Sequence, residues 1–122
     1  MQSKPITLIL GATPNPERYA YQAALRLQKY QYPYVLVGIK KGEILAKNIL
    51  NHKEIQPNID TITLYIGAQN QPEWYDYILQ TKPRRVIFNP GTENPELMEI
   101  LAKNEIEVIP ACTLVMLSTG QY

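Results

Sequence analysis

The 122-residue sequence is poor in the residues that form disulfides and metal sites, with one cysteine, Cys112, and one histidine, His52. A single cysteine excludes an internal disulfide and a multi-cysteine metal cluster. No H-x-x-x-H, H-E-x-x-H or C-x-x-C spacing provides another metal site. We expect His52 to be a surface residue, and Cys112 to be either a small buried side chain or a thiol that senses or bonds a ligand thiol. We therefore expect neither a metal nor an enzymatic activity.

Long hydrophobic runs and an excess of one charge are absent as well. No apolar stretch approaches the about 20 residues that a membrane-spanning helix needs, and the first ten residues have too short an apolar core for a signal peptide. The formal net charge of +1 indicates no general affinity for nucleic acid. With 45% hydrophobic residues, the sequence fits a cytoplasmic globular protein that forms a single domain over residues 1–122.

What the sequence does contain is an alternation of apolar runs and amphipathic segments. Nearly continuous apolar runs are typical of parallel strands buried on both faces. They occupy 6–10, 34–39, 61–66, 85–89 and 107–111. Helical spacing of apolar residues, with a proline at each first turn, predicts three helices. They cover 16–31, 72–81 and 95–104.

These elements predict an α/β fold, a Rossmann-like doubly wound parallel sheet of five strands in the order 3-2-1-4-5, with helices on both faces. The segment 40–60 is less regular and predicts a loop, a short extended piece and one helical turn. In doubly wound sheets, ligands bind beyond the carboxyl ends of the strands, where the strand order reverses.

The loop after the first predicted strand carries groups suited to a pyrophosphate. A helix start offers free backbone N–H groups, Thr13 a hydroxyl, Asn15 an amide, and Arg18 a guanidinium that can bind phosphate through two hydrogen bonds. The alternative is a capped turn with Arg18 on the surface. The patterns G-x-G-x-x-G and G-x-x-x-x-G-K-[ST] are absent, which argues against a nicotinamide dinucleotide and against nucleoside triphosphate hydrolysis.

Two further loops carry similar signals. Lys40 and Lys41 follow the second strand, where dinucleotide-binding folds have an acidic residue for a ribose, so they favour a phosphorylated ribose unless they are simply solvated. After the fourth strand, the polar turn 89–94 contains Pro90 and Gly91, which fix the backbone and permit close approach of a ligand. In the predicted strand order this loop faces the first one, although it could serve only as a helix cap.

The segments LGATPNPERYAYQAALRL, VGIKKGEILAKNI, VIFNPGTENPEL and IEVIPACTLVML resemble, in this order, the small bacterial CoA-binding domain proteins. These are stand-alone relatives of the CoA-binding domain of succinyl-CoA ligase alpha subunits. The resemblance covers about residues 6 to 119 and implies a groove for CoA or an acyl-CoA at the carboxyl edge of the sheet. It implies Gly11, Ala12, Thr13, Asn15 and Arg18 at the pyrophosphate, Ile39, Lys40 and Lys41 at the adenosine and its 3′-phosphate, and Pro90, Gly91, Thr92 and Glu93, next to Asn89, along the pantetheine.

Two residues depart from the common pattern of this family. Tyr19 stands where many relatives have proline, and its ring would either stack on adenine or partly fill the groove; Ile39 stands near another common proline. The expected function is non-catalytic binding of CoA or an acyl-CoA. The alternatives are an accessory subunit of an acyl-CoA ligase or transferase, and a nicotinamide-nucleotide-binding regulator. A homodimer or protein partner is expected if Tyr75 and Tyr77 are exposed.

Overall fold

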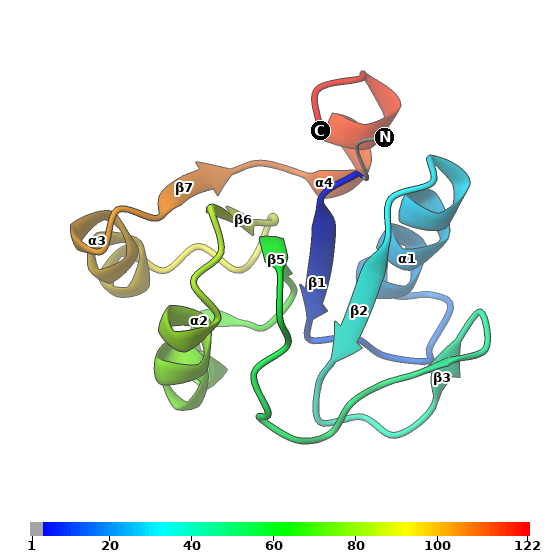
Figure 1. Cartoon of the computed structure of the whole chain (residues 1–122), viewed down its shortest axis with the longest axis horizontal. Coiled ribbons are helices and arrows are strands. Elements are labelled where there is room, and N and C mark those ends of the chain that lie inside the picture. Colours follow the sequence, from blue (N-terminus) through cyan, green and yellow to red (C-terminus); the bar gives the residue numbers. More distant parts are fainter. Residues whose placement is uncertain (1–3) are drawn as a thin grey trace.

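The computed structural model describes residues 4–122 and contains a five-stranded parallel sheet (Figure 1). Its strands are β1 (Ile6–Leu10), β2 (Tyr34–Val37), β5 (Ile59–Leu64), β6 (Arg85–Phe88) and β7 (Glu107–Pro110). They overlap the five predicted runs to within two residues at each end, because a strand covered on both faces must be largely apolar. Every residue of β6 is buried, for example. No helix within residues 4–122 is long and apolar enough to cross a membrane.

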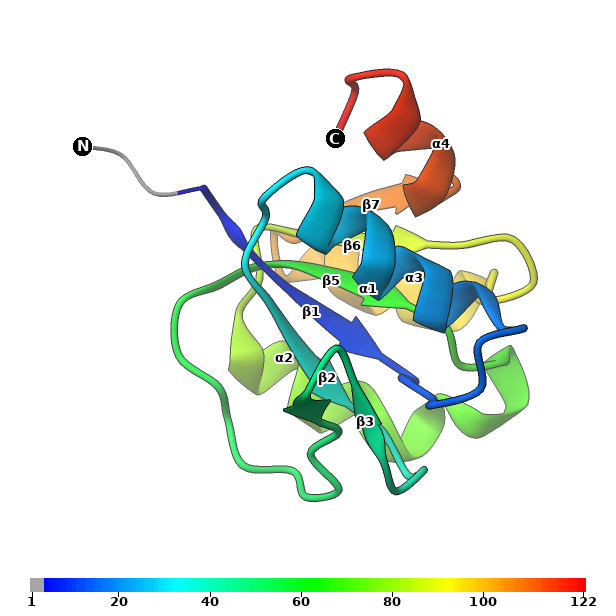
Figure 2. The same cartoon turned by 90° about the vertical axis from the view of Figure 1, so that its right-hand side faces the viewer.

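Helices cover both faces of the sheet (Figure 2). On one face, α1 (Tyr19–Lys29) packs beside α4 (Thr113–Ser118), and the alanines and Leu27 of α1 bury against β1 and β2. On the other face lie α2 (Tyr75–Thr81) and α3 (Pro95–Lys103), with η1 (Ala68–Asn70) and η2 (Pro72–Trp74) as short 3-10 turns before α2. The doubly wound α/β fold is thus confirmed.

Several boundaries differ from the predicted ones by a few residues, and three differences are larger. Helix α1 begins at Tyr19, since Pro16 and Glu17 form a turn in which Arg18 N donates to Asn15 O (3.1 Å). The segment 40–60 contains a hairpin of β3 (Glu43–Ile44) and β4 (Lys47–Asn48), and no helical turn. Helix α4 was not expected at all.

The strand order is β2-β1-β5-β6-β7, so the third sheet strand lies between the first and the fourth, and the predicted order 3-2-1-4-5 is wrong. Residues 49–51 occupy the outer edge of β2 instead. There Leu50 N donates to Leu36 O (2.9 Å) and Gly38 N donates to Leu50 O (3.1 Å). β5 pairs in parallel with the other edge of β1. The switch point therefore lies between β1 and β5.

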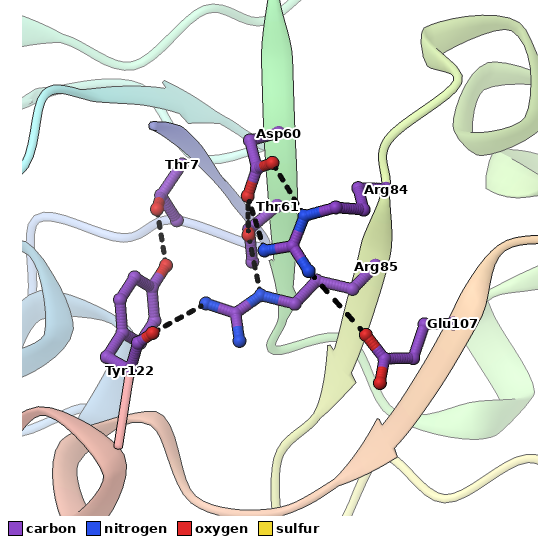
Figure 3. A network of polar contacts seen from close by, with 7 residues as sticks. All are labelled: Thr7, Asp60, Thr61, Arg84, Arg85, Glu107 and Tyr122. Atoms are coloured by element: carbon purple, nitrogen blue, oxygen red, sulfur yellow. Dashed lines mark hydrogen bonds and ion pairs between the residues drawn. The ribbon is translucent and has the colours of Figure 1, made fainter. Parts of the chain in front are cut away.

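An ion-pair network lies at the amino ends of the strands, opposite the switch-point edge (Figure 3). Arg84 donates from Nε to Asp60 Oδ1 (2.9 Å) and from Nη2 to Asp60 Oδ2 (3.1 Å). Its Nη1 lies 3.7 Å from Glu107 Oε1. The hydrogen bonds from Arg84 lower the pKa of the Asp60 carboxyl against the opposing effect of burial. The network ties β5, β6 and β7 together at this edge.

Beside it, the C-terminal segment is fastened to the same edge. The buried Arg85 donates from Nε to Thr61 Oγ1 (2.8 Å), and its guanidinium carbon lies 4.7 Å from the centre of the Tyr122 ring. The Tyr122 hydroxyl is hydrogen-bonded to Thr7 in β1. A cation over an aromatic face is favourable, most of all where water is excluded. The segment after α4 is therefore held against β1 and β6 by polar contacts (Figure 3).

Candidate functional site

A cleft of about 570 Å³ opens at the carboxyl ends of the strands, at the switch point between β1 and β5. Four loops line it, namely those that follow β1, β2, β5 and β6. The switch point is where an open α/β sheet leaves a crevice, because the two connections there depart to opposite faces. The location agrees with the expectation for this fold, although three loops were expected and four are found.

Most of the predicted ligand residues come together in this cleft. Those that line it are Gly11, Ala12, Thr13, Arg18, Tyr19, Ile39, Lys40, Pro90, Gly91 and Thr92. Lys41 is exposed next to it and does not line it. The side chains of Tyr19 and Ile39 are 73% and 75% exposed, so neither of them fills the cleft.

Three other predicted residues lie outside the cleft and serve the local structure. Asn15 Oδ1 accepts from Glu17 N (3.0 Å) in the turn before α1, and Glu93 Oε1 accepts from Gly91 N (2.8 Å). Asn89 is only 1% exposed. Its Nδ2 donates to Leu64 O (2.9 Å), and its Oδ1 accepts from Thr113 N at the start of α4 (2.9 Å). The Asn89 side chain thus joins β5 to the C-terminal segment.

The first loop is shaped by a glycine that another loop contacts. Gly11 has φ +99°, and a Cβ atom there would lie 2.9 Å from the backbone of Tyr65, which follows β5. Gly11 N and Ala12 N both donate to Val37 O (2.9 and 3.1 Å), which joins the loop to β2. Arg18 then precedes α1, whose start has no side-chain cap and no acidic residue in its first turn among the described residues. No carboxylate in the first turn of α1 therefore offsets the positive end of its dipole.

The second loop is held by a residue that sequence reasoning missed. Asn51 Nδ2 donates to Gly38 O (2.7 Å) and to Lys40 O (2.9 Å). Gly38 packs so tightly on the first loop that a Cβ atom would lie 2.9 Å from Ala12 O. Nothing in the local pattern around Asn51 distinguishes it from the other asparagines of this polar segment.

The third loop, after β5, was missed because the predicted strand order placed this strand at the outer edge of the sheet. It contributes Tyr65, Ile66, Gly67 and Asn70 to the cleft. A signal was present: YIGAQNQPEW, like the first and fourth loops, has a glycine and polar residues between an apolar strand and a helix that starts with proline. Burial raises the pKa of Tyr65 to about 12, so its phenol stays neutral; the Thr63 and Thr113 hydroxyls act weakly in the other direction.

One buried amide joins the third and fourth loops. Gln71 is completely buried, and its Nε2 donates to Ile66 O and to Thr92 O, both at 2.8 Å. Its Oε1 accepts from Asn94 Nδ2 (2.8 Å). Asn94 also caps α3, since its Oδ1 accepts from Leu97 N (3.3 Å). Two walls of the cleft are therefore held at a fixed spacing by side-chain hydrogen bonds.

The charges that line the cleft favour an anion. Arg18 and Lys40 are the cations in the lining, and Glu73 is its carboxylate. Glu73 Oε2 lies 3.9 Å from Lys53 Nζ, which also sits 4.6 Å from the centre of the Trp74 ring. The Glu73 charge is thus offset by a cation of its own, while Arg18 and Lys40 have no ion-pair partner in residues 4–122.

The tyrosines considered for a partner surface and the single cysteine lie outside the cleft. Tyr77 is buried in the core and Tyr75 is half-buried, so the condition set for a partner surface there is not met. Cys112 is a free, half-buried thiol before α4 and does not line the cleft. Residues 4–122 contain no group of three or more histidine, cysteine, aspartate or glutamate side chains that could hold a metal ion.

Comparison with known proteins identifies the family. The family described as "CoA binding domain" matches residues 6–118. The crystal structure of an uncharacterized protein is 55% identical, covers 99% of this chain and 100% of its own, and superimposes with a TM-score of 0.96. A Thermus thermophilus protein shares the fold at 18% identity and a TM-score of 0.84, with 98% of this chain and 91% of that protein covered. A Pyrococcus horikoshii protein shares it at 22% identity and a TM-score of 0.83, with 97% of this chain and 84% of that protein covered. A search of curated proteins found no match. Because the family match spans nearly the whole chain, the resemblance seen in the sequence is confirmed, and this chain belongs to the CoA-binding domain family.

Proposed function

We propose that this chain binds CoA or an acyl-CoA in the cleft, and that it does so without catalysing a reaction itself. The observation that carries the proposal is the convergence of four loops, with Arg18 and Lys40, on one cleft at the switch point of a CoA-binding family member. The cleft volume lies within the range of about 300–1,000 Å³ usual for small-molecule sites. Such a module would deliver or sense the ligand.

Different residues of the cleft suit different chemical groups of the proposed ligand. The uncapped start of α1 and the Arg18 guanidinium suit a pyrophosphate, which accepts both backbone and bidentate side-chain hydrogen bonds. Lys40, with Lys41 beside it, suits the phosphate on the ribose. Pro90, Gly91 and Thr92 would border the pantetheine, since a Cβ atom at Gly91 would meet nothing within 4 Å and the backbone is open to close approach.

Calorimetric titration of the protein with CoA, dephospho-CoA, NAD and ATP at one salt concentration tests the proposal. We expect CoA to bind most tightly, with a dissociation constant in the micromolar range. Arg18→Ala should weaken CoA binding by about 1.5–3 kcal/mol, the worth of a charged hydrogen bond, while Lys29→Ala at the far end of α1 should leave it unchanged. Absence of CoA binding would overturn the proposal, and tighter binding of NAD would point to a nicotinamide-nucleotide regulator.

A further inference from the structure

The cleft contains one acidic side chain, that of Glu73. It lines the cleft together with the cations Arg18 and Lys40, and no other aspartate or glutamate of residues 4–122 does so. Its side chain is 61% exposed, so the carboxylate is accessible from the cleft. Like charges brought together on binding cost free energy. An uncompensated Glu73 would therefore repel the anion that Arg18 and Lys40 attract.

Lys53 contacts this wall without lining the cleft itself. Its Nζ donates to Glu73 O (2.7 Å), lies 3.9 Å from Glu73 Oε2, and lies 4.6 Å from the centre of the Trp74 ring. Trp74 lines the cleft and is only 3% exposed, and its ring packs edge to face on Tyr77 with 5.5 Å between the ring centres. Three contacts of different kinds thus hold one ammonium group against the wall that carries Glu73.

The contacts of Lys53 bear more on the charge of the cleft than on the stability of the fold. The side chains of Lys53 and Glu73 are 46% and 61% exposed, and an exposed pair of this kind contributes little to stability. Charges closer together than the Debye length, about 8 Å at physiological salt, still act on each other and on a bound anion. The lining by itself has two cations and one carboxylate, and Lys53 supplies the charge that offsets the carboxylate.

We propose that Lys53 is a positioning residue that sets how tightly the cleft binds an anion, because its ammonium group offsets the Glu73 carboxylate from outside the cleft. It acts through Glu73 and does not touch the ligand. This inference rests on the proposed function, in which the ligand carries phosphate groups. A ligand with more negative charge should depend more on Lys53 than a ligand with less, and loss of the lysine charge should lower the affinity while the protein stays folded.

The first test compares CoA binding by the wild type, Lys53→Gln and Lys53→Arg in calorimetric titrations at low salt. We expect Lys53→Gln to bind CoA about fivefold more weakly, the ratio that corresponds to the about 1 kcal/mol of an exposed charge interaction. Lys53→Arg keeps the charge and should bind as the wild type. Lys103→Gln, which breaks an exposed pair with Glu99 on α3 (3.0 Å), is the matched control and should do the same. Equal binding by Lys53→Gln and the wild type would overturn the inference.

A second test separates the charge from the local structure. Because Lys53 acts through Glu73, Lys53→Gln should have no further effect in a Glu73→Gln background, and Glu73→Gln alone should bind CoA at least as tightly as the wild type. The loss in Lys53→Gln should be smaller for dephospho-CoA than for CoA. It should also shrink in 1 M salt, where the Debye length falls to about 3 Å. A loss that persists in the Glu73→Gln background or at high salt would mean that Lys53 only supports the shape of the wall, and would overturn the inference.

Binding by the wild type tests the proposed function separately. If the wild type binds neither CoA nor dephospho-CoA, the proposed function fails, and the same variants are compared with inorganic pyrophosphate as the probe. Weaker binding of pyrophosphate by Lys53→Gln, restored when Glu73→Gln is added, would support the role of Lys53. Equal binding of pyrophosphate by all variants, or no binding by the wild type, would overturn it.

Discussion

Replacing Gln71 with leucine removes the amide that joins two walls of the cleft. The side chain is completely buried and makes hydrogen bonds to Ile66 O, Thr92 O and Asn94 Nδ2, each 2.8 Å long. Leucine is similar in size, so the loss is one of hydrogen bonds and not of packing. Both carbonyl oxygens then lose the donor that serves them inside the protein.

The magnitude follows from these two carbonyls. A buried polar group left without its partner costs about 1–3 kcal/mol. Asn94 Nδ2 keeps its hydrogen bond to the Tyr75 hydroxyl (2.9 Å) and adds little to the cost. Because Ile66 and Thr92 border the open cleft, water can partly replace the lost donor. We therefore expect Gln71→Leu to lower the free energy of unfolding by about 3 kcal/mol, a large share of the about 5–15 kcal/mol typical of a domain.

Urea denaturation followed by the fluorescence of Trp74 measures this change. Trp74 is the single tryptophan and is 3% exposed, so its emission reports unfolding. The midpoint should fall while the slope with denaturant concentration stays the same. Gln80→Leu, at an exposed position of α2, is the matched control. A loss below about 1 kcal/mol, indistinguishable from that control, would refute the role given to Gln71.

Two further predictions concern the backbone of the cleft and the opposite edge of the sheet. Gly11→Ala should destabilise the protein by at least about 2 kcal/mol, because the new Cβ atom would lie 2.9 Å from Tyr65 backbone atoms at φ +99°. Gly91→Ala, at φ +93° with open space, should cost only about 1 kcal/mol in the same denaturation assay, and equal losses would contradict the contact. Asp60→Asn should cost about 1 kcal/mol or less at pH 7, since Arg84 is 57% exposed and its charge is screened. Arg84 lowers the pKa of the Asp60 carboxyl from 3.8, so the ion pair stabilises the protein above pH 3.8 and this stabilisation is lost as the pH falls through the lowered pKa. A difference in stability between Asp60→Asn and the wild type that persists at low pH would contradict the ion pair.

The strands and the two helical layers were predictable because a strand buried on both faces needs apolar residues, which can be seen in the sequence. The run at 85–89 has the apolar residues Val86, Ile87 and Phe88 at its centre, and β6 is buried throughout. The residue types do not indicate which strands are neighbours in the sheet. Strands pair through backbone hydrogen bonds, which any residue type except proline can make. Because the predicted order placed β5 at the outer edge of the sheet, the loop after β5 was not included in the predicted site.

The candidate site was predictable where a residue type itself carries the chemistry, as for Arg18 and Lys40. It was not predictable where an amide acts through distant partners. Gln71 and Asn51 bind carbonyl groups of other loops, so their roles exist only in the folded chain. Asn89 shows the converse: a polar residue in the right loop whose side chain turns inward and docks α4.

The contact of residues 49–51 with β2 also bears on self-association. An open sheet edge presents unpaired backbone groups on which a second chain can add a strand. On the β2 side Leu36 O and Gly38 N already bond to Leu50. On the other side β7 has only four residues, with Pro110, which has no N–H, and the charged Glu107. The segment 49–51 on one side and the short β7 on the other thus protect the sheet against edge-to-edge aggregation in concentrated solution.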